Sequence, residues 1–260
     1  MRFLYVCLFI CVASIFCAKA DRIIIKGDTT NFWPDKSALE QHTDIQHIRK
    51  FLAGYKTEPC FDCHAVDYIA EWTILDNTLH LTGIYPDNSR KPGRKADLNE
   101  IFNVGNSRVK ADWVNADFWI PVGKPLRWPN MMTPVYRAEL LLAIKNGQLV
   151  KQQELKYPTE RRLESNEISE FIYSKIRWGK IPWLGKQQIK VFTYFETGAT
   201  GKPEKATIAR KTDCKPCNEE ALRSLSLMPW PADYKEGKIY RSAYTQPLIF
   251  SEQQRKKYAH

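Results

Sequence analysis

Hydrophobic and polar positions change from a helical repeat to a strand repeat in the C-terminal part of the chain. The apolar residues of 167–177 recur at helical spacing, which predicts an amphipathic helix that begins at the cap residue Asn166. Over 188–196, apolar and polar residues alternate instead, which predicts a strand with one buried face. Gly198 and Gly201 then mark a turn.

The pattern continues with a second strand, a second helix and a third strand. Residues 203–211 alternate again, and 217–228 form a helical stretch that ends before Pro229. Residues 238–245 alternate once more, and Pro247 after them indicates a strand at the edge of a sheet. The predicted order is α-β-β-α-β, which implies a three-stranded antiparallel sheet with two helices on one face.

The first part of the chain is richer in predicted strands. Its helical stretches are 37–55, with Ser37 as cap, and 98–102. We expect hairpins around Asp76-Asn77-Thr78 and Asn146-Gly147, because these are tight-turn sequences between runs of strand-forming residues. The expected strands are 22–26, 66–75, 79–85, 108–120, 135–144 and 148–154.

A charged and polar stretch over 155–166 separates the two parts, and we place a domain boundary there. The expected fold class is α+β. It combines a β-rich N-terminal domain over 21–155, to which no motif assigns a role, with a C-terminal domain over 156–260.

The chain begins with an apolar run over 3–17 that precedes Ala18-Lys19-Ala20. A short apolar run before a small-x-small tripeptide is typical of a secretory signal peptide, here residues 1–20. The run is shorter than the roughly 20 residues that a membrane helix needs. We therefore expect export, with no stable membrane span after cleavage; an uncleaved segment would anchor the protein in the inner membrane.

The composition is that of a soluble globular protein, with 43% hydrophobic and 26% charged residues and a mean hydropathy of −0.45. It excludes a disordered, collagen-like or polytopic membrane chain. The net charge of +10 falls by two when Arg2 and Lys19 leave with the signal peptide. A basic surface suits an acidic protein or anionic lipid, or is simply solvated, and export argues against nucleic acid as partner.

Four cysteines follow the predicted signal peptide in two Cys-x-x-Cys pairs: Cys60, Cys63, Cys214 and Cys217. In an exported chain such pairs indicate disulfides first, within a pair or between pairs. The first pair with His64 also fits c-type haem attachment, and Met131 or Met132 could then complete the iron ligands. All four could instead bind zinc, and the second pair, just before a helix, could exchange thiols. We favour structural disulfides, with no cofactor and no metal.

Side chains on and after the second predicted helix are expected to have structural roles. Arg223 lies one turn after Glu219, which predicts an exposed ion pair. We expect Met228, Trp230 and Tyr234 to pack in the core or over it.

Four short motifs occur in order within 218–251: Glu219-Glu220-Ala221-Leu222-Arg223, Met228-Pro229, Gly237-Lys238 and Pro247-Leu248-Ile249-Phe250. In this order, and with 188–196 as first strand, the segment resembles the TonB C-terminal domain family, the part of an energy transducer that engages outer-membrane receptors. Two departures stand out: Trp178-Gly179 occupies the place of the family's usual Tyr-Pro, and no Pro-rich spacer precedes the domain.

The resemblance implies that a receptor peptide adds as a new strand beside the last strand of the domain. An edge strand offers unpaired backbone groups for such an addition. We therefore predict a partner-binding edge strand made of Lys238, Ile239, Tyr240, Arg241, Ser242, Ala243 and Tyr244.

No G-x-S-x-G, H-E-x-x-H or Gly-rich phosphate-loop motif is present, so we expect no enzymatic activity. The expected function is that of a periplasmic protein that binds a TonB-dependent outer-membrane receptor, or another envelope protein, by β-strand addition and so supports outer-membrane transport. The alternative is an exported redox or haem protein that uses its Cys-x-x-Cys motifs.

Overall fold

The computed structural model describes most of the chain after residue 20. The described residues are 21–25, 27–32, 37–54, 68–86, 95–105, 107–128 and 134–259. The predicted signal peptide therefore lies outside the described residues. Within the ranges that are described, no helix is both long enough and apolar enough to cross a membrane.

The chain folds into two compact units. The first contains the residues up to Pro121 together with Leu140–Glu154, and the second contains Val122–Glu139 together with Leu155–His260. Residues 122–139, which precede the boundary expected from the sequence, thus cluster with the second unit.

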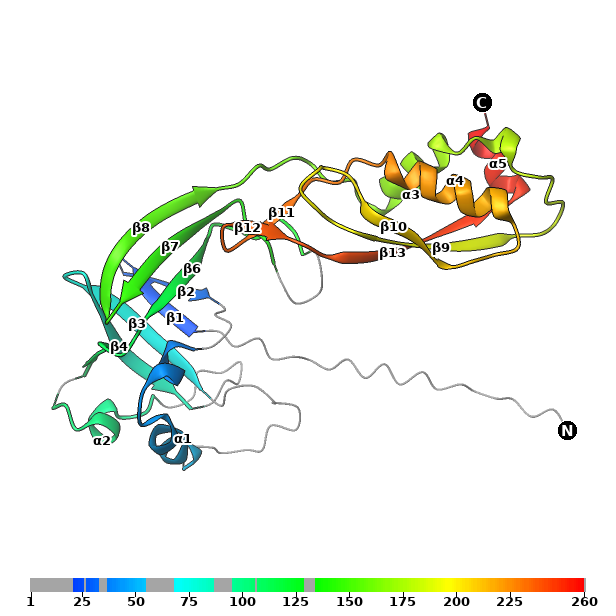
Figure 1. The fold of residues 1–260 in the computed structure, drawn as a ribbon. Helices are drawn as coiled ribbons and strands as arrows, with labels where there is room; N and C mark the ends of the chain where they lie inside the picture. The colour runs from blue at the N-terminus through cyan, green and yellow to red at the C-terminus, as the bar shows by residue number, and fades with distance from the viewer. Residues whose placement is uncertain are drawn as a thin grey trace, which may run out of the picture. The chain divides into compact units, whose positions relative to one another are not determined.

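The first unit is built on one mixed sheet (Figure 1). Its strand order is β2-β1-β3-β4-β8-β7-β6, with β5 paired to β4. β1 runs parallel to β3, whereas its pairing with β2 and that of β3 with β4 are antiparallel. The strands are β1 Asp21–Ile25, β2 Asp28–Phe32, β3 Ile69–Leu75, β4 Thr78–Tyr85, β5 Val109–Lys110, β6 Ala116–Val122, β7 Ala138–Lys145 and β8 Gln148–Lys156. The helices are η1 Ala38–Gln41, α1 Ile45–Ala53 and α2 Leu98–Phe102.

Both hairpins predicted for this region are confirmed. Asp76 and Asn77 have φ values of 47° and 60°, and Asn146 and Gly147 have 47° and 71°. These left-handed values are the ones that a type I′ turn needs at both central positions. A Cβ atom at Gly147 would also lie 2.6 Å from the carbonyl oxygen of Ala111, so a larger residue does not fit there.

Two elements predicted as continuous are split. The stretch 37–55 forms η1 and then α1 as separate helices. Ser37 caps the 3-10 turn of η1, and this turn closes with a bond from the N–H of His42 to the carbonyl of Leu39, before α1 begins at Ile45. The stretch 108–120 forms β5 and β6, because the N–H of Val114 donates to the carbonyl of Ala111 at 3.1 Å and closes a turn.

The second unit contains the predicted α-β-β-α-β order as α3, β9, β10, α4 and β13. Its three long strands form an antiparallel sheet in the order β10-β9-β13. α3 and α4 lie together on one face of this sheet (Figure 1). The α+β fold class is thereby confirmed. The elements are α3 Ser165–Lys175, η2 Trp178–Lys180, β9 Ile189–Glu196, β10 Glu204–Arg210, α4 Lys215–Ser226, β11 Asp233–Lys235, β12 Lys238–Tyr240, β13 Ala243–Phe250 and α5 Glu252–Tyr258.

The alternation predicted for β9 explains how this unit forms its core. Val191, Thr193 and Phe195 are buried, while the residues between them are partly exposed. Met228 and Trp230 are also buried, as expected from the sequence. One face of the central strand therefore packs against the helices, and the order of the sheet leaves β10 and β13 at its two edges.

Candidate partner-binding edge of the C-terminal sheet

β13 is the regular edge strand of the second unit. Its residues from Ala243 to Phe250 pair with β9, from Glu196 back to Ile189, without a register shift. No strand pairs with the other side of β13 within the part of the chain that the structure describes. One side of this strand is therefore available to a further strand.

The direction of the backbone groups follows from the bond at the start of the ladder. The carbonyl of Ser242 accepts the N–H of Thr197 at 2.8 Å, so the backbone groups of Ser242 face β9. In an antiparallel pair, alternate residues form the hydrogen-bonded pairs, and every second residue after Ser242 also faces β9. The outward-facing positions are Ala243, Thr245, Pro247 and Ile249.

Two of these four positions have no N–H to offer. The N–H of Ile249 already donates to the hydroxyl of Tyr173 in α3 at 2.8 Å, and Pro247 has no N–H. Ala243 and Thr245 remain as outward donors, and their carbonyls are outward acceptors. The carbonyl of Pro247 already accepts from Nε2 of Gln246 at 3.2 Å and has its second lone pair left to accept another bond. A strand added here would form hydrogen bonds along Ala243–Pro247. It would end before Ile249, whose N–H is already bound to Tyr173.

β10 forms the opposite edge and has a different character. Its pairing with β9 shifts register between Glu204 and Thr207 and again between Ile208 and Arg210. Lys205 lies within the first shift with a φ of 48°. Bulges and lysines are common devices that prevent strand addition, so the sheet has one regular edge and one irregular edge.

Ion pairs connect β10 to β9 and to the segment between β12 and β13. Nη1 of Arg241, just before β13, lies 2.7 Å from Oε2 of Glu204, and Nζ of Lys205 lies 2.8 Å from Oε2 of Glu196. The hydrogen bond from Arg241 lowers the pKa of Glu204, and that from Lys205 lowers the pKa of Glu196. Both acids are therefore ionised at neutral pH, and they fix Arg241 and Lys205 at the β10 side of the sheet.

Aromatic and charged side chains hold the first part of β13 in place. The ring of Tyr244 lies 5.0 Å from that of Trp230, and the guanidinium of Arg162 lies 4.4 Å from the Trp230 ring. Arg162 also pairs with Asp233 at 2.6 Å, and Arg127 contacts the other oxygen of this fully buried carboxylate. The unit's own packing thus orders the edge before any partner binds.

The structure distributes the predicted edge-strand residues over two strands. Lys238, Ile239 and Tyr240 form β12, which pairs with β11 across a turn at Glu236-Gly237, and Arg241 and Ser242 lie between the strands. Only Ala243 and Tyr244 belong to β13. The prediction of a single strand over 238–245 was wrong, because the left-handed turn at Glu236 and Gly237 makes the first residues of that range the second arm of a separate hairpin.

The outward positions after Tyr244 were missed by the sequence analysis. Pro247 was the available signal: a proline within a strand has to sit where no ladder N–H is needed, which fixes the orientation of its neighbours. The hydrogen bond from the N–H of Ile249 to the hydroxyl of Tyr173 had no such local signal, since the two residues are 76 positions apart.

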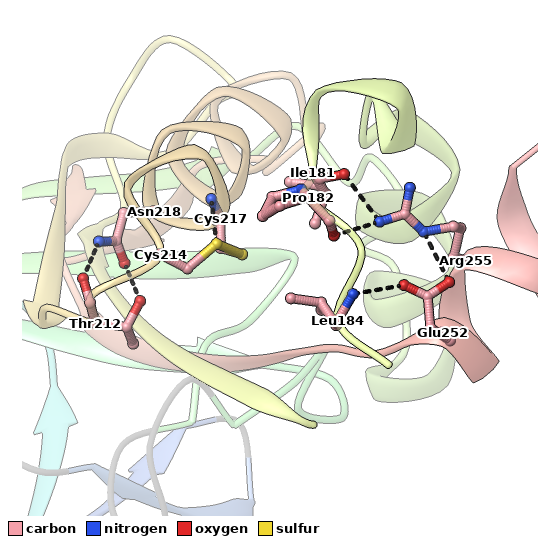
Figure 2. Close-up of a disulfide and its surroundings, with 9 residues drawn as sticks. All are labelled: Ile181, Pro182, Leu184, Thr212, Cys214, Cys217, Asn218, Glu252 and Arg255. Atoms are coloured by element: carbon pink, nitrogen blue, oxygen red, sulfur yellow. Dashed lines mark hydrogen bonds and ion pairs between the residues drawn. A yellow bond between two sulfur atoms is a disulfide. The ribbon is translucent and has the colours of Figure 1, made fainter. Parts of the chain in front are cut away.

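The second Cys-x-x-Cys pair forms a disulfide between Cys214 and Cys217 at the first turn of α4 (Figure 2). Cys60, Cys63 and the haem-type motif that ends at His64 lie outside the described residues, as do Met131 and Met132. Among the residues that are described, no cluster of three His, Cys, Asp or Glu side chains could hold a metal.

Figure 2 also shows how α5 holds the segment that follows η2. Arg255 donates to the carbonyls of Ile181 and Pro182 at 2.9 Å and 2.7 Å, and Glu252 accepts the N–H of Leu184 at 3.0 Å. Trp183, between these fixed residues, is 76% exposed. No local sequence pattern indicated this exposed tryptophan on a fixed backbone.

The chain matches no protein-family model, no curated protein and no solved structure.

Proposed function

We propose that this protein is a periplasmic, non-enzymatic binding protein that takes up a strand of an outer-membrane receptor, or of another envelope protein, at the edge of β13. Binding there would support transport across the outer membrane. The observation that carries the proposal is the regular edge of β13, with outward N–H groups at Ala243 and Thr245.

The resemblance to the TonB C-terminal domain family adds support, because its motifs fall at matching places in the second unit. Glu219–Arg223 lies within α4, Met228-Pro229 follows this helix, and Pro247–Phe250 ends β13. The resemblance assigns the receptor peptide to the last strand of the domain, and within the described residues no strand pairs with the side of β13 that faces away from β9.

The expected strength of binding follows from the outward groups. The two donors and three acceptors along Ala243–Pro247 permit up to five main-chain hydrogen bonds, each with a net contribution of about 1 kcal/mol. The cost of ordering a flexible peptide offsets much of this gain. Alternate side chains of the peptide would therefore have to supply specificity and the rest of the affinity.

The proposal is tested by replacing an outward residue with proline. Thr245→Pro removes the N–H that faces away from β9 and leaves the ladder to β9 intact, as Pro247 already does two residues later. Thr245→Val is the matched control, because it keeps both the N–H and the β-branched shape.

The full chain and both variants are immobilised and exposed to solubilised outer membranes, and bound proteins are identified by mass spectrometry. The wild type and Thr245→Val should retain a TonB-dependent receptor, while Thr245→Pro should lose about 80% of it, the effect of one lost main-chain bond of about 1 kcal/mol. Equal capture by all three proteins, or no enriched receptor, contradicts the proposal.

Location is tested separately by mass spectrometry of the protein isolated from its native cells. A periplasmic protein that begins at Asp21 is the expected result. Retention of residues 1–20 would replace the soluble form with an inner-membrane anchored one.

A further inference from the structure

The two cysteines of the Cys214–Cys217 disulfide differ in their exposure to solvent. Cys214 is partly exposed and caps α4, whereas Cys217 is completely buried in the core of the second unit. Cys214 packs against the edge of this core, so we expect an incoming thiolate to reach Cys214 and not Cys217. Such asymmetry is what directed thiol–disulfide exchange requires, because attack must occur at one sulfur while the other leaves.

The surroundings of Cys214 favour a thiolate once the bond is open. The N–H of Cys217 donates to Sγ of Cys214 at 3.2 Å, and the 12-residue helix α4 directs its positive end toward this sulfur. The nearest charged neighbours in sequence are the exposed Lys211, Asp213 and Lys215, which add a net positive charge. A hydrogen-bond donor and positive charge both stabilise a thiolate at a helix start.

The bond adds little as a structural crosslink. Its cysteines are three residues apart, so it closes a very short loop, and the stabilisation from chain entropy is smallest for such loops. The same turn is held without sulfur: the side chain of Asn218 donates to the carbonyl of Thr212 at 2.9 Å and accepts from its hydroxyl at 3.0 Å, as Figure 2 shows. The first turn of α4 can therefore persist when the disulfide is open.

We propose that Cys214 and Cys217 form a thiol–disulfide exchange site that accepts electrons from a partner dithiol. One thiolate of the partner attacks Sγ of Cys214, a new S–S bond forms, and the bond to Cys217 breaks. Cys217 leaves with the electron pair and takes up a proton. The partner's second thiolate then attacks its own sulfur in the mixed disulfide and releases Cys214 as a thiolate. In sum, the partner dithiol is oxidised to a disulfide, and Cys214–Cys217 is reduced by two electrons.

The first test uses the unmodified full chain and dithiothreitol as the dithiol. The protein is equilibrated with defined ratios of reduced and oxidised dithiothreitol, quenched in acid, alkylated, and mapped by mass spectrometry of the peptide that contains both cysteines. We expect the pair to open in one two-thiol transition while circular dichroism stays unchanged. A bond that opens only when denaturant unfolds the second unit is a structural crosslink and overturns the proposal.

The second test separates the two sulfurs by comparing Cys217→Ser with Cys214→Ser. Each variant is treated with oxidised glutathione, and the mixed disulfide on the remaining cysteine is followed by peptide mapping. Cys214 in the Cys217→Ser variant should react at least about ten-fold faster than Cys217 in the other. Equal rates, or a faster Cys217, contradict the assignment of Cys214 as the attacked sulfur. Should either variant fail to fold, the first test still decides.

Discussion

Asp21 in the first unit and Glu220 in the second are both buried acids, with side chains held by different kinds of partner. Asp21 accepts hydrogen bonds from neutral donors, the hydroxyl of Ser37 at 2.8 Å and the indole of Trp72 at 3.1 Å, and no cation pairs with it among the described residues. Glu220 accepts from the guanidinium groups of two arginines, Arg177 at 2.8 Å and Arg223 at 3.0 Å.

The partners decide which protonation state the fold prefers. Burial raises the pKa of Asp21 to about 6, because neutral hydrogen bonds offset the desolvation only in part. Burial also acts to raise the pKa of Glu220, but the bonds from Arg177 and Arg223 outweigh it and lower the value to about 2. Protonation by acid should therefore stabilise the folded first unit through Asp21 and destabilise the folded second unit through Glu220.

The largest effect is expected from removing the carboxylate of Glu220. Glu220→Ala should cost about 3–4 kcal/mol, because a buried ion pair is broken and Arg177 and Arg223 lose their shared acceptor. Urea unfolding at pH 7, with hydrogen exchange to assign the loss to the second unit, measures it. The matched control is Glu219→Ala, whose exposed carboxylate lies 4.0 Å from Lys215 and should matter by less than about 0.5 kcal/mol. Similar losses of stability in both variants would contradict the role of Glu220 as a buried ion-pair partner.

The same comparison can be sharpened by acid. The folded pKa of Asp21 is raised from 3.8 to about 6, so the folded first unit binds the proton more tightly than the unfolded chain does. Its stability should therefore rise by up to about 3 kcal/mol as the pH falls from 6 to 4. For Glu220 the folded pKa is depressed, so the second unit should keep its ion-pair stability above pH 4.5 and lose it as the pH falls toward 2.

The difference between wild type and Asp21→Asn isolates the first of these responses, because the amide does not titrate. The stability difference, measured by urea unfolding at several pH values, should change between pH 4 and 6 and level off on both sides. A difference that stays constant over this window would show that Asp21 has an ordinary pKa in the folded protein.

A smaller effect is expected from the hydroxyl that supports Asp21. Ser37→Ala removes one hydrogen bond to a buried carboxylate and should cost about 1.5 kcal/mol at pH 7. It should also raise the midpoint of the acid response above pH 6, because this bond lowers the pKa of Asp21. Ser107→Ala, at an exposed position of the same unit, serves as control and should leave both quantities unchanged. A loss of stability without a shift of the midpoint would assign Ser37 a role only as cap of η1.

Local patterns were sufficient to predict the strands in which apolar and polar residues alternate with burial, and the turns that need particular residues. The alternation over 188–196 matched β9 because one face of that strand packs against helices. The turns at Asp76-Asn77 and Asn146-Gly147 were predictable because few residues tolerate their left-handed backbone. The three-stranded sheet followed from the order of these elements.

Contacts between distant residues could not be predicted in this way. Alternation continues from β12 into β13, so the pattern alone did not reveal the break at Arg241, where the chain leaves the β11–β12 hairpin. The exposed pair predicted for Arg223 and Glu219 was also wrong, since Arg223 pairs with the buried Glu220 instead. α5 was missed because its sequence has no apolar stripe; its contacts to 181–184 are polar.

The aromatic contact at the start of β13 has an optical consequence. Trp230 lies against Tyr244, on the strand where a partner is proposed to dock, and its indole N–H has no acceptor among the described groups. The emission of an indole depends on its immediate surroundings, so the proposed docking strand has an intrinsic fluorophore beside it. Subtracting the spectrum of a Trp230→Phe variant separates this signal from those of the other tryptophans, of which the chain has eight in total. Occupancy of the edge thus becomes visible in solution without a label.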